Sequence, residues 1–375
     1  MPKSQNTRLV SWIDCPGGGQ VWVDGTTLFV GHMDSPAGTS IYDVADPAHP
    51  QLLTRLEMPR GWHSHKVRAK DNIMIVNHER QKSDAVADFS GGLGIYDISQ
   101  PAAPKLLKKW EVSGGSGVHR FDYDGRYAFI SPTAEGFVGN IVVILDLIDP
   151  ANPVEIGRWW IPGQNVGAGE VYPWAEDWPK PRCHHPLRQG DRLYVSYWHH
   201  GFFILDISDK TNPRLVSGYN TSPSQPHPTH TCLVMPELMA GRKIMVVADE
   251  DMSKLRPSPP SFAWVYDITD EEQPISIGTI NVPELMLDPT PRPETTGCHQ
   301  PSEVFTQPIL PFAWFSHGLR IMNISNPFRS EQVGYYQPDA PEGFATACAN
   351  DVTQDSRGLI YMTDRNRGVH IIERV

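Results

Sequence analysis

The chain has 375 residues, and its 43 acidic and 32 basic side chains give a formal net charge of −11. This balance, without a long basic run, argues against nucleic acid or an anionic membrane surface as a partner. No stretch has the apolar length of a membrane span, and the first residues lack the apolar core of a secretion signal, so we expect a cytoplasmic location. The five cysteines lack paired spacing, so no disulfide framework is expected.

A short apolar pattern that ends in a polar residue returns seven times along the chain. Its copies end at Asp43, Asp97, Asp146, Asp206, Asp267, Asn323 and Glu373. Successive copies are 49 to 61 residues apart, which is typical of propeller blades. Seven copies predict seven blades, and an acid that recurs in nearly every blade is expected to have a structural role.

The neighbours of each copy follow the same order along the chain. Two apolar runs separated by a polar turn, such as 23–25, come before the pattern, and a turn rich in Asp, Asn, Ser and Pro, such as 44–50, comes after it. Proline lacks an amide hydrogen, and short polar side chains bond the nearby backbone, so these turns end strands. With a fourth apolar run such as 106–110, the unit is predicted to be four short strands.

We therefore expect one all-β domain over residues 1–375, a seven-bladed β-propeller. The expected blades cover residues 19–61, 62–115, 116–163, 183–221, 227–283, 298–337 and 347–375. The last copy leaves no room for a fourth strand, whereas residues 8–14 look like the fourth strands of other blades. The N-terminal strand is predicted to complete the last blade, which removes an exposed sheet edge.

The Ile-Tyr-Asp pattern at Ile95 to Asp97 and its variants, with the proline turns behind them, resembles the repeat of the LVIVD family. The resemblance covers nearly the whole chain and implies a β-propeller, the fold of that family's members. It says almost nothing about activity, so the function has to be sought where blades differ from the repeat.

Histidine recurs near the start of the first strand in several predicted blades. Alignment on the apolar residue that opens this strand places His65, His119, His185 and His230 at one position, and His299 follows with an offset of one residue. Because first strands lie nearest the propeller axis, these imidazoles are expected to converge on one mouth of the channel. Neutral imidazole is the commonest metal ligand, so the pattern predicts a mononuclear metal site held by His65, His119, His185 and either His230 or His299.

Fe(II) is the favoured ion, because four neutral imidazoles leave the ion its charge and open positions for dioxygen. The expected function is an oxidoreductase, similar to non-haem iron oxygenases, that acts on an aromatic or apolar small molecule. Zinc or manganese in the same pocket would instead support a lyase or hydrolase, and Gln300 beside His299 keeps that alternative open. A third alternative is a protein-interaction scaffold whose histidines only bond neighbouring blades.

Three groups are candidate catalytic residues: Glu303, which follows His299 on its strand, and His63 and His184 beside the predicted ligands. A carboxylate near a metal-bound water can act as a general base, and Glu303 is favoured for that role. Further acids are expected near the mouth: Asp249, Glu250, Asp251 and Asp351.

Long insertions after second and fourth strands are expected to open onto the histidine face, and residues 163–182 are predicted to form a lid. The walls of the substrate site are expected to come from Trp62, Tyr172, Trp174, Tyr197 and Trp198. A second set of histidines follows second strands and is expected to orient ligands or to contact substrate: His32, His78, His199 or His200, and His317.

Overall fold

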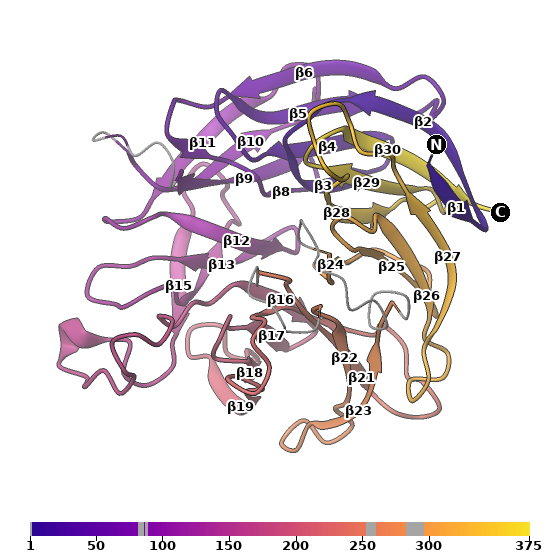
Figure 1. Ribbon diagram of the computed structural model, residues 1–375. Coiled ribbons are helices and arrows are strands. Elements are labelled where there is room, and N and C mark those ends of the chain that lie inside the picture. Colours follow the sequence, from indigo (N-terminus) through magenta and orange to yellow (C-terminus); the bar gives the residue numbers. More distant parts are fainter. Residues whose placement is uncertain (1, 82–85, 87–88, 253–259, 283–295) are drawn as a thin grey trace.

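The strands of this protein form seven sheets around a central axis (Figure 1). The computed structural model describes residues 2–81, 86, 89–252, 260–282 and 296–375. Across these ranges the one helical element is a short 3-10 turn, η1 (Val166–Ala168). The prediction of an all-β, seven-bladed β-propeller is therefore confirmed. None of the helical structure in the described ranges is long and apolar enough to cross a membrane.

The first four sheets follow one another along the chain. The first contains β3 (Gly18–Asp24), β4 (Thr27–His32), β5 (Ala37–Asp43) and β6 (Gln51–Glu57). The second contains β7 (Trp62–His63), β8 (Val67–Lys70), β9 (Ile73–Arg80), β10 (Gly92–Asp97) and β11 (Lys105–Glu111), with β7 and β8 both paired to β9. The third contains β12 (Val118–Tyr123), β13 (Tyr127–Pro132), β14 (Val142–Asp146) and β15 (Val154–Trp159). The fourth contains β16 (His185–Gln189), β17 (Arg192–Ser196), β18 (Phe202–Asp206) and β19 (Arg214–Tyr219).

The last three sheets complete the ring. The fifth contains β20 (Thr229–Val234), β21 (Ile244–Asp249), β22 (Ala263–Asp267) and β23 (Ile275–Ile280). The sixth contains β24 (Gln300–Pro301), β25 (Ile309–Ala313), β26 (Leu319–Asn323) and β27 (Glu331–Gln337), with β1 (Lys3–Gln5) as a fifth strand. The seventh contains β28 (Ala349–Gln354), β29 (Ile360–Asp364), β30 (Gly368–Arg374) and β2 (Thr7–Asp14).

The ring is closed by the two ends of the chain. Strand β2 pairs antiparallel with β30, with Leu9 opposite Ile372 and Ile13 opposite Val369. The N-terminal strand thus completes the last blade, as the sequence predicts, and the two termini lie close together (Figure 1). Pairing both ends in one sheet hides the free edge that β30 would otherwise present.

The Asp or Asn that ends the first six copies of the repeat pattern holds the turn behind it. Oδ1 of Asp97 accepts a hydrogen bond of 2.8 Å from the amide of Ser99, and Oδ1 of Asp206 accepts one of 2.8 Å from Ser208. The equivalent bond recurs in four other blades, at Asp43, Asp146, Asp267 and Asn323. A short side chain with an oxygen is needed for this contact, which explains the choice of Asp and Asn.

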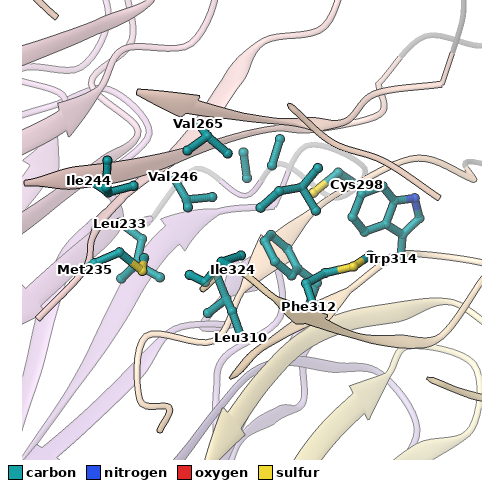
Figure 2. Packing of buried hydrophobic residues seen from close by; sticks show 14 of the residues in the cluster. Leu233, Met235, Ile244, Val246, Val265, Cys298, Leu310, Phe312, Trp314 and Ile324 are labelled. Carbon is teal, nitrogen blue, oxygen red and sulfur yellow. The ribbon is translucent and has the colours of Figure 1, made fainter. Parts of the chain in front are cut away.

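The hydrophobic core is divided into seven clusters, each packed between two neighbouring blades. Figure 2 shows the cluster between the fifth and sixth sheets, to which Val246 from β21 and Phe312 and Trp314 from the next blade belong. The five cysteines are free thiols, and Cys298 belongs to this cluster. Because each blade is stabilised by its neighbours, the first strands are held as a rigid inner ring.

The first strands of neighbouring blades contact one another in a closed order around the axis: β3, β8, β12, β16, β20, β24 and β28. Residues at the starts of these strands therefore meet at one mouth of the channel, although they lie far apart in the sequence.

Candidate metal centre

Six imidazoles lie side by side at this mouth of the channel. In order around the axis they are His63, His65, His119, His184, His230 and His299, which we call the histidine arc. The centroids of neighbouring rings in this order are 3.8 to 5.1 Å apart. All six side chains line one cavity of about 360 Å³.

The arc is open at the first and seventh blades. The first blade has Gly19 at this position, and a Cβ added there would lie 2.7 Å from both the Cβ and the carbonyl oxygen of His65. The seventh blade has Asn350, whose Nδ2 donates to the carbonyl of Gly19 at 2.7 Å. The close approach of Gly19 to His65 leaves no room for a seventh imidazole.

The structure places His184, and not His185, in the arc, which corrects the predicted ligand set. The amides of Lys66, Arg120 and His185 each donate to a polar side chain of the adjacent strand, at Asn77, Ser131 and Ser196 respectively. His185 is therefore equivalent to residues that follow arc histidines, and it lies deeper in the channel. Pro186 takes the place of Val67 and Phe121, so an alignment on the aliphatic Leu187 shifts the fourth blade by one residue.

Hydrogen bonds at Nδ1 determine which nitrogen most arc histidines present to the cavity. Nδ1 of His184 donates to the carbonyl of His230 at 2.9 Å, and Nδ1 of His299 donates to the carbonyl of Asn350. Nδ1 of His119 donates to Oε2 of Glu79 at 2.7 Å. A carbonyl or carboxylate only accepts, so each Nδ1 carries the hydrogen and each Nε2 of the neutral ring has a free lone pair.

His230 reaches the same state through a hydroxyl. Oγ1 of Thr231 donates to Oε1 of Gln300 at 2.8 Å, so it accepts from Nδ1 of His230 at 2.9 Å. His63 donates from Nδ1 to the carbonyl of Met33. His65 differs, because its Nδ1 lies 3.5 Å from an amide donor, Nδ2 of Asn77.

The Nε2 atoms of His119 and His184 face each other at 2.9 Å. Two lone pairs at this distance repel unless a cation lies between them. A proton is a poor candidate, since burial holds the pKa of both imidazoles well below the usual range. Two ligands bound at right angles to an ion at about 2.1 Å would be separated by about 3.0 Å, so this pair fits a metal.

Two carboxylates complete the donor set of the cavity. Oε1 of Glu250 lies 3.6 Å from Nε2 of His299, and its Oε2 lies 3.9 Å from Nε2 of His230. One donor atom each from His184, His230 and Glu250 lie within 4.8 Å of one another, and the same holds for a second group of His63, His65 and Glu79. Burial raises the pKa of Glu250, whose charged form a metal would stabilise.

Glu79 is more heavily engaged than Glu250. It accepts from His119, and its Oε1 lies 3.6 Å from Nη2 of Arg182, whose guanidinium in turn lies 5.0 Å from the ring of Trp198. Glu79 therefore orients His119 by holding the Nδ1 hydrogen, which directs Nε2 of that ring into the cavity.

The predicted ligands thus separate into two groups. His119, His230 and His299 direct Nε2 at the cavity, and His65 lies in the arc beside them. His185 lies outside it, with Nε2 3.5 Å from Oε1 of Glu303. Of the candidate catalytic residues, His63 and His184 line the cavity.

Glu303 lies elsewhere in the channel. It accepts from Nη2 of Arg120 at 2.9 Å and from Nη2 of Arg68, and it lines a second cavity of about 370 Å³ with Trp22 and Asp122. Glu303 is therefore part of a buried ion-pair cluster, which corrects its predicted place beside the metal. Among the four other acids expected near the mouth, Glu250 lines the histidine cavity.

One of the five predicted wall residues lines the cavity. The ring of Trp198 lies 4.7 Å from that of His184, at an angle of 30°. Trp62 packs on His78 with the ring centroids 4.9 Å apart, and Tyr197 is buried, with its hydroxyl donating to Oε1 of Gln164.

The remaining aromatic candidates belong to the loop at residues 163–182. The rings of Tyr172 and Trp174 contact each other, with centroids 5.1 Å apart, and Trp174 packs on His200 at 4.9 Å. This pair lies beside the turn between β17 and β18 and does not line the histidine cavity. His32 is likewise held away from it, by Ser40. Of the insertions predicted on this face, residues 253–259 and 283–295 lie outside the described ranges.

Four cations that the histidine pattern does not reveal also line the cavity: Lys66, Arg80, Arg182 and Arg365. Lys66 directly follows His65 on the first strand, so the alignment that locates the arc also locates this side chain. Arg365 comes from the turn between β29 and β30, a position that the repeat does not connect with the mouth.

Comparison with known proteins agrees with this architecture. A family model described as the LVIVD repeat matches residues 85–111 and 189–221. The chain is a β-propeller that carries LVIVD repeats in these two segments. None of the curated proteins matches its sequence.

Solved structures similar to this propeller span nearly its whole length. The periplasmic gluconolactonase PpgL of Pseudomonas aeruginosa has a TM-score of 0.64 and 13% identity, over 91% of this chain and 89% of that one. U3-55K has a TM-score of 0.63 and 9% identity, over 98% of both chains. At these identities the similarity shows the propeller fold alone.

Proposed function

We propose that this protein is a metal-dependent enzyme whose ion is held at the histidine mouth by His184, His230 and Glu250, with His119 and His299 adjacent. The opposed Nε2 atoms of His119 and His184 carry this proposal, because a cation beside them would relieve the repulsion of two lone pairs 2.9 Å apart. The buried and oriented donors around them support it, since a mononuclear site needs several convergent ligands.

Fe(II) is the ion we favour. Two histidines and one carboxylate with open positions are typical of non-haem iron oxygenases, and His184, His230 and Glu250 provide that set. A bound Fe(II) would supply activation of dioxygen. In the protein, Glu79 keeps the Nδ1 hydrogen on His119, and the Trp198 ring offers a flat apolar wall beside His184.

The reaction we propose is therefore an oxidation of a small molecule with an aromatic or apolar part. We place it in the cytoplasm, without a nucleic-acid or membrane partner, on the basis of the acidic charge and the sequence of the chain.

A zinc- or manganese-dependent hydrolase or lyase is the second candidate. PpgL, to which the chain is similar in fold, is a gluconolactonase. Glu250, 3.6 Å from the Nε2 of His299, would suit a general base in such a reaction. The alternatives differ in the ion and in the need for oxygen.

Metal analysis of the purified protein tests the proposal. After anaerobic reconstitution with Fe(II), we expect about one ion per chain, and less than about 0.2 ion with every metal tried would contradict a metal enzyme. Oxygen uptake with a panel of small aromatic substrates should then depend on iron. Lactone hydrolysis under nitrogen by the zinc- or manganese-loaded protein would favour the second candidate instead.

A further inference from the structure

The histidine cavity has more positive charge than an acidic protein would be expected to place there. Apart from the histidines, its lining contains four cations, Lys66, Arg80, Arg182 and Arg365, against the carboxylates Asp34, Glu79 and Glu250. The chain as a whole has a formal charge of −11. A divalent ion on the arc would increase the local excess, so the cavity is built to receive negative charge.

Lys66 is the clearest example of a positive charge placed in this cavity. Its side chain is almost fully buried and lines the cavity, yet its ammonium makes no hydrogen bond or ion pair within the described part of the chain. A buried cation is normally paired, because removing it from water without a partner is costly. Burial lowers the pKa of Lys66, Arg120 lowers it further, and the carboxylates of Asp351 and Glu250 raise it.

Arg365 also places positive charge in the cavity. Its Nε donates to Oδ1 of Asn350 at 2.7 Å, which fixes the guanidinium, and the group lies 5.6 Å from the ring of Phe315. Neither of its Nη groups has a partner among the described residues. Arg182 is different, because Glu79 lies 3.6 Å from it.

We infer that Lys66 and Arg365 form an anion-binding subsite in the histidine cavity, and that the substrate carries a carboxylate held by these two cations. A planar carboxylate suits the guanidinium fork of Arg365, and the ammonium of Lys66 adds a point charge. The rest of the substrate would face the Trp198 ring. This substrate class refines the proposed function, but the subsite itself exists without a metal.

Binding of benzoate, measured by equilibrium dialysis on both the metal-free and the metal-loaded protein, tests the inference. Phenyl phosphate and neutral benzamide serve as companion probes of the same size. We expect benzoate to bind at least about tenfold more tightly than benzamide in both forms of the protein. A stronger preference for phenyl phosphate would keep the subsite and identify its anion as a phosphate.

Variants separate the subsite from the metal. Lys66→Met and Arg365→Gln should each weaken benzoate binding at least about tenfold, with metal content per chain unchanged. Arg8→Gln, which removes an exposed cation paired with Glu373, is the matched control and should bind like the wild type. Thermal melting identifies any variant that fails to fold.

Two results would overturn the inference. One is equal binding of benzoate and benzamide. The other is benzoate binding that both variants retain and that disappears with the metal, since the ion alone would then hold the anion. A protein that binds no metal but loses benzoate affinity in the variants would refute the proposed enzyme and leave the subsite standing.

Discussion

Nη2 of Arg120 lies 2.9 Å from Oε1 of Glu303 across the channel, although 183 residues separate the two in the sequence. The Arg120 side chain is fully buried, and Arg68, also buried, binds the other oxygen of the same carboxylate. One acid therefore joins the second, third and sixth blades beneath the histidine arc.

Glu303→Gln should destabilise the fold and leave metal binding intact. The change leaves two buried guanidinium groups with a neutral partner, and breaking a buried pair typically costs about 3 to 5 kcal/mol. Urea unfolding measures this loss. Glu155→Gln, which removes an exposed pair with Arg158, is the control and should cost about 1 kcal/mol or less. A loss of metal in Glu303→Gln with unchanged stability would restore Glu303 as a group at the metal.

The neighbours His184 and His185 offer a matched test of the register. His184→Ala should lower metal affinity by at least about tenfold, because it removes a ligand whose Nε2 faces that of His119. His185→Ala should keep the metal, since its Nε2 lies near Glu303. Metal analysis of both folded variants decides the matter, and the reverse order of effects would contradict the described arc.

His370 predicts a pH dependence of stability away from the metal. The side chain is buried against Tyr336, and burial lowers its pKa to about 3. Between about pH 6.5 and pH 3 the unfolded chain binds a proton that the folded protein does not, so the free energy of unfolding falls as the pH decreases. The slope for this group is about 1.4 kcal/mol per pH unit.

Urea unfolding at pH 7 and pH 5 checks this effect. From its ordinary pKa near 6.5 down to pH 5, the group should contribute a loss of about 2 kcal/mol in the wild type. His370→Phe keeps a ring in the core and removes the titrating group, so its loss over the same interval should be smaller by that amount. Equal losses in the two proteins would show that His370 is protonated in the folded state.

Removal of residues 2–14 should destabilise the protein strongly, because β30 would lose its partner and Ile13 its packing. We expect a loss of about 5 kcal/mol or more, or aggregation through the free edge. Removal of residues 2–5 takes away only the exposed strand β1 and should cost about 1 kcal/mol. Thermal melting of both truncated proteins tests this difference, and similar melting temperatures would contradict the role of β2.

The blades and the closing strand could be predicted because each leaves a local pattern in the sequence. The acids of the repeat accept a hydrogen bond from the turn that follows them, as Asp97 and Asp206 do. The number of copies therefore gives the number of blades. The mouth of the channel at which the histidines meet could be predicted in the same way, because His65, His119 and His230 occupy equivalent positions in their blades.

The residues that make up the site were harder to predict from the sequence. Pro186 interrupts the apolar pattern of the fourth blade, so the pattern predicts His185 in place of His184. Glu79 and Arg365 lie at strand ends and turns, and their meeting at the mouth depends on how separate blades are placed around the axis. Spacing along one chain does not contain that information. Glu303 comes after His299 in the chain, which here runs from the mouth into the channel. Its side chain therefore lies deeper in the channel than the histidine arc.

The contact between Gly19 and His65 has a consequence for the stereochemistry of any reaction in the cavity. Seven similar blades would surround the axis almost uniformly, and a ligand on such an axis could bind in several equivalent rotations. Because Gly19 admits no side chain, imidazoles occupy one side of the mouth, while Asn350 and Arg365 occupy the other. The mouth of the channel is therefore asymmetric around the axis, and we expect a single bound orientation and a single stereoisomer of product.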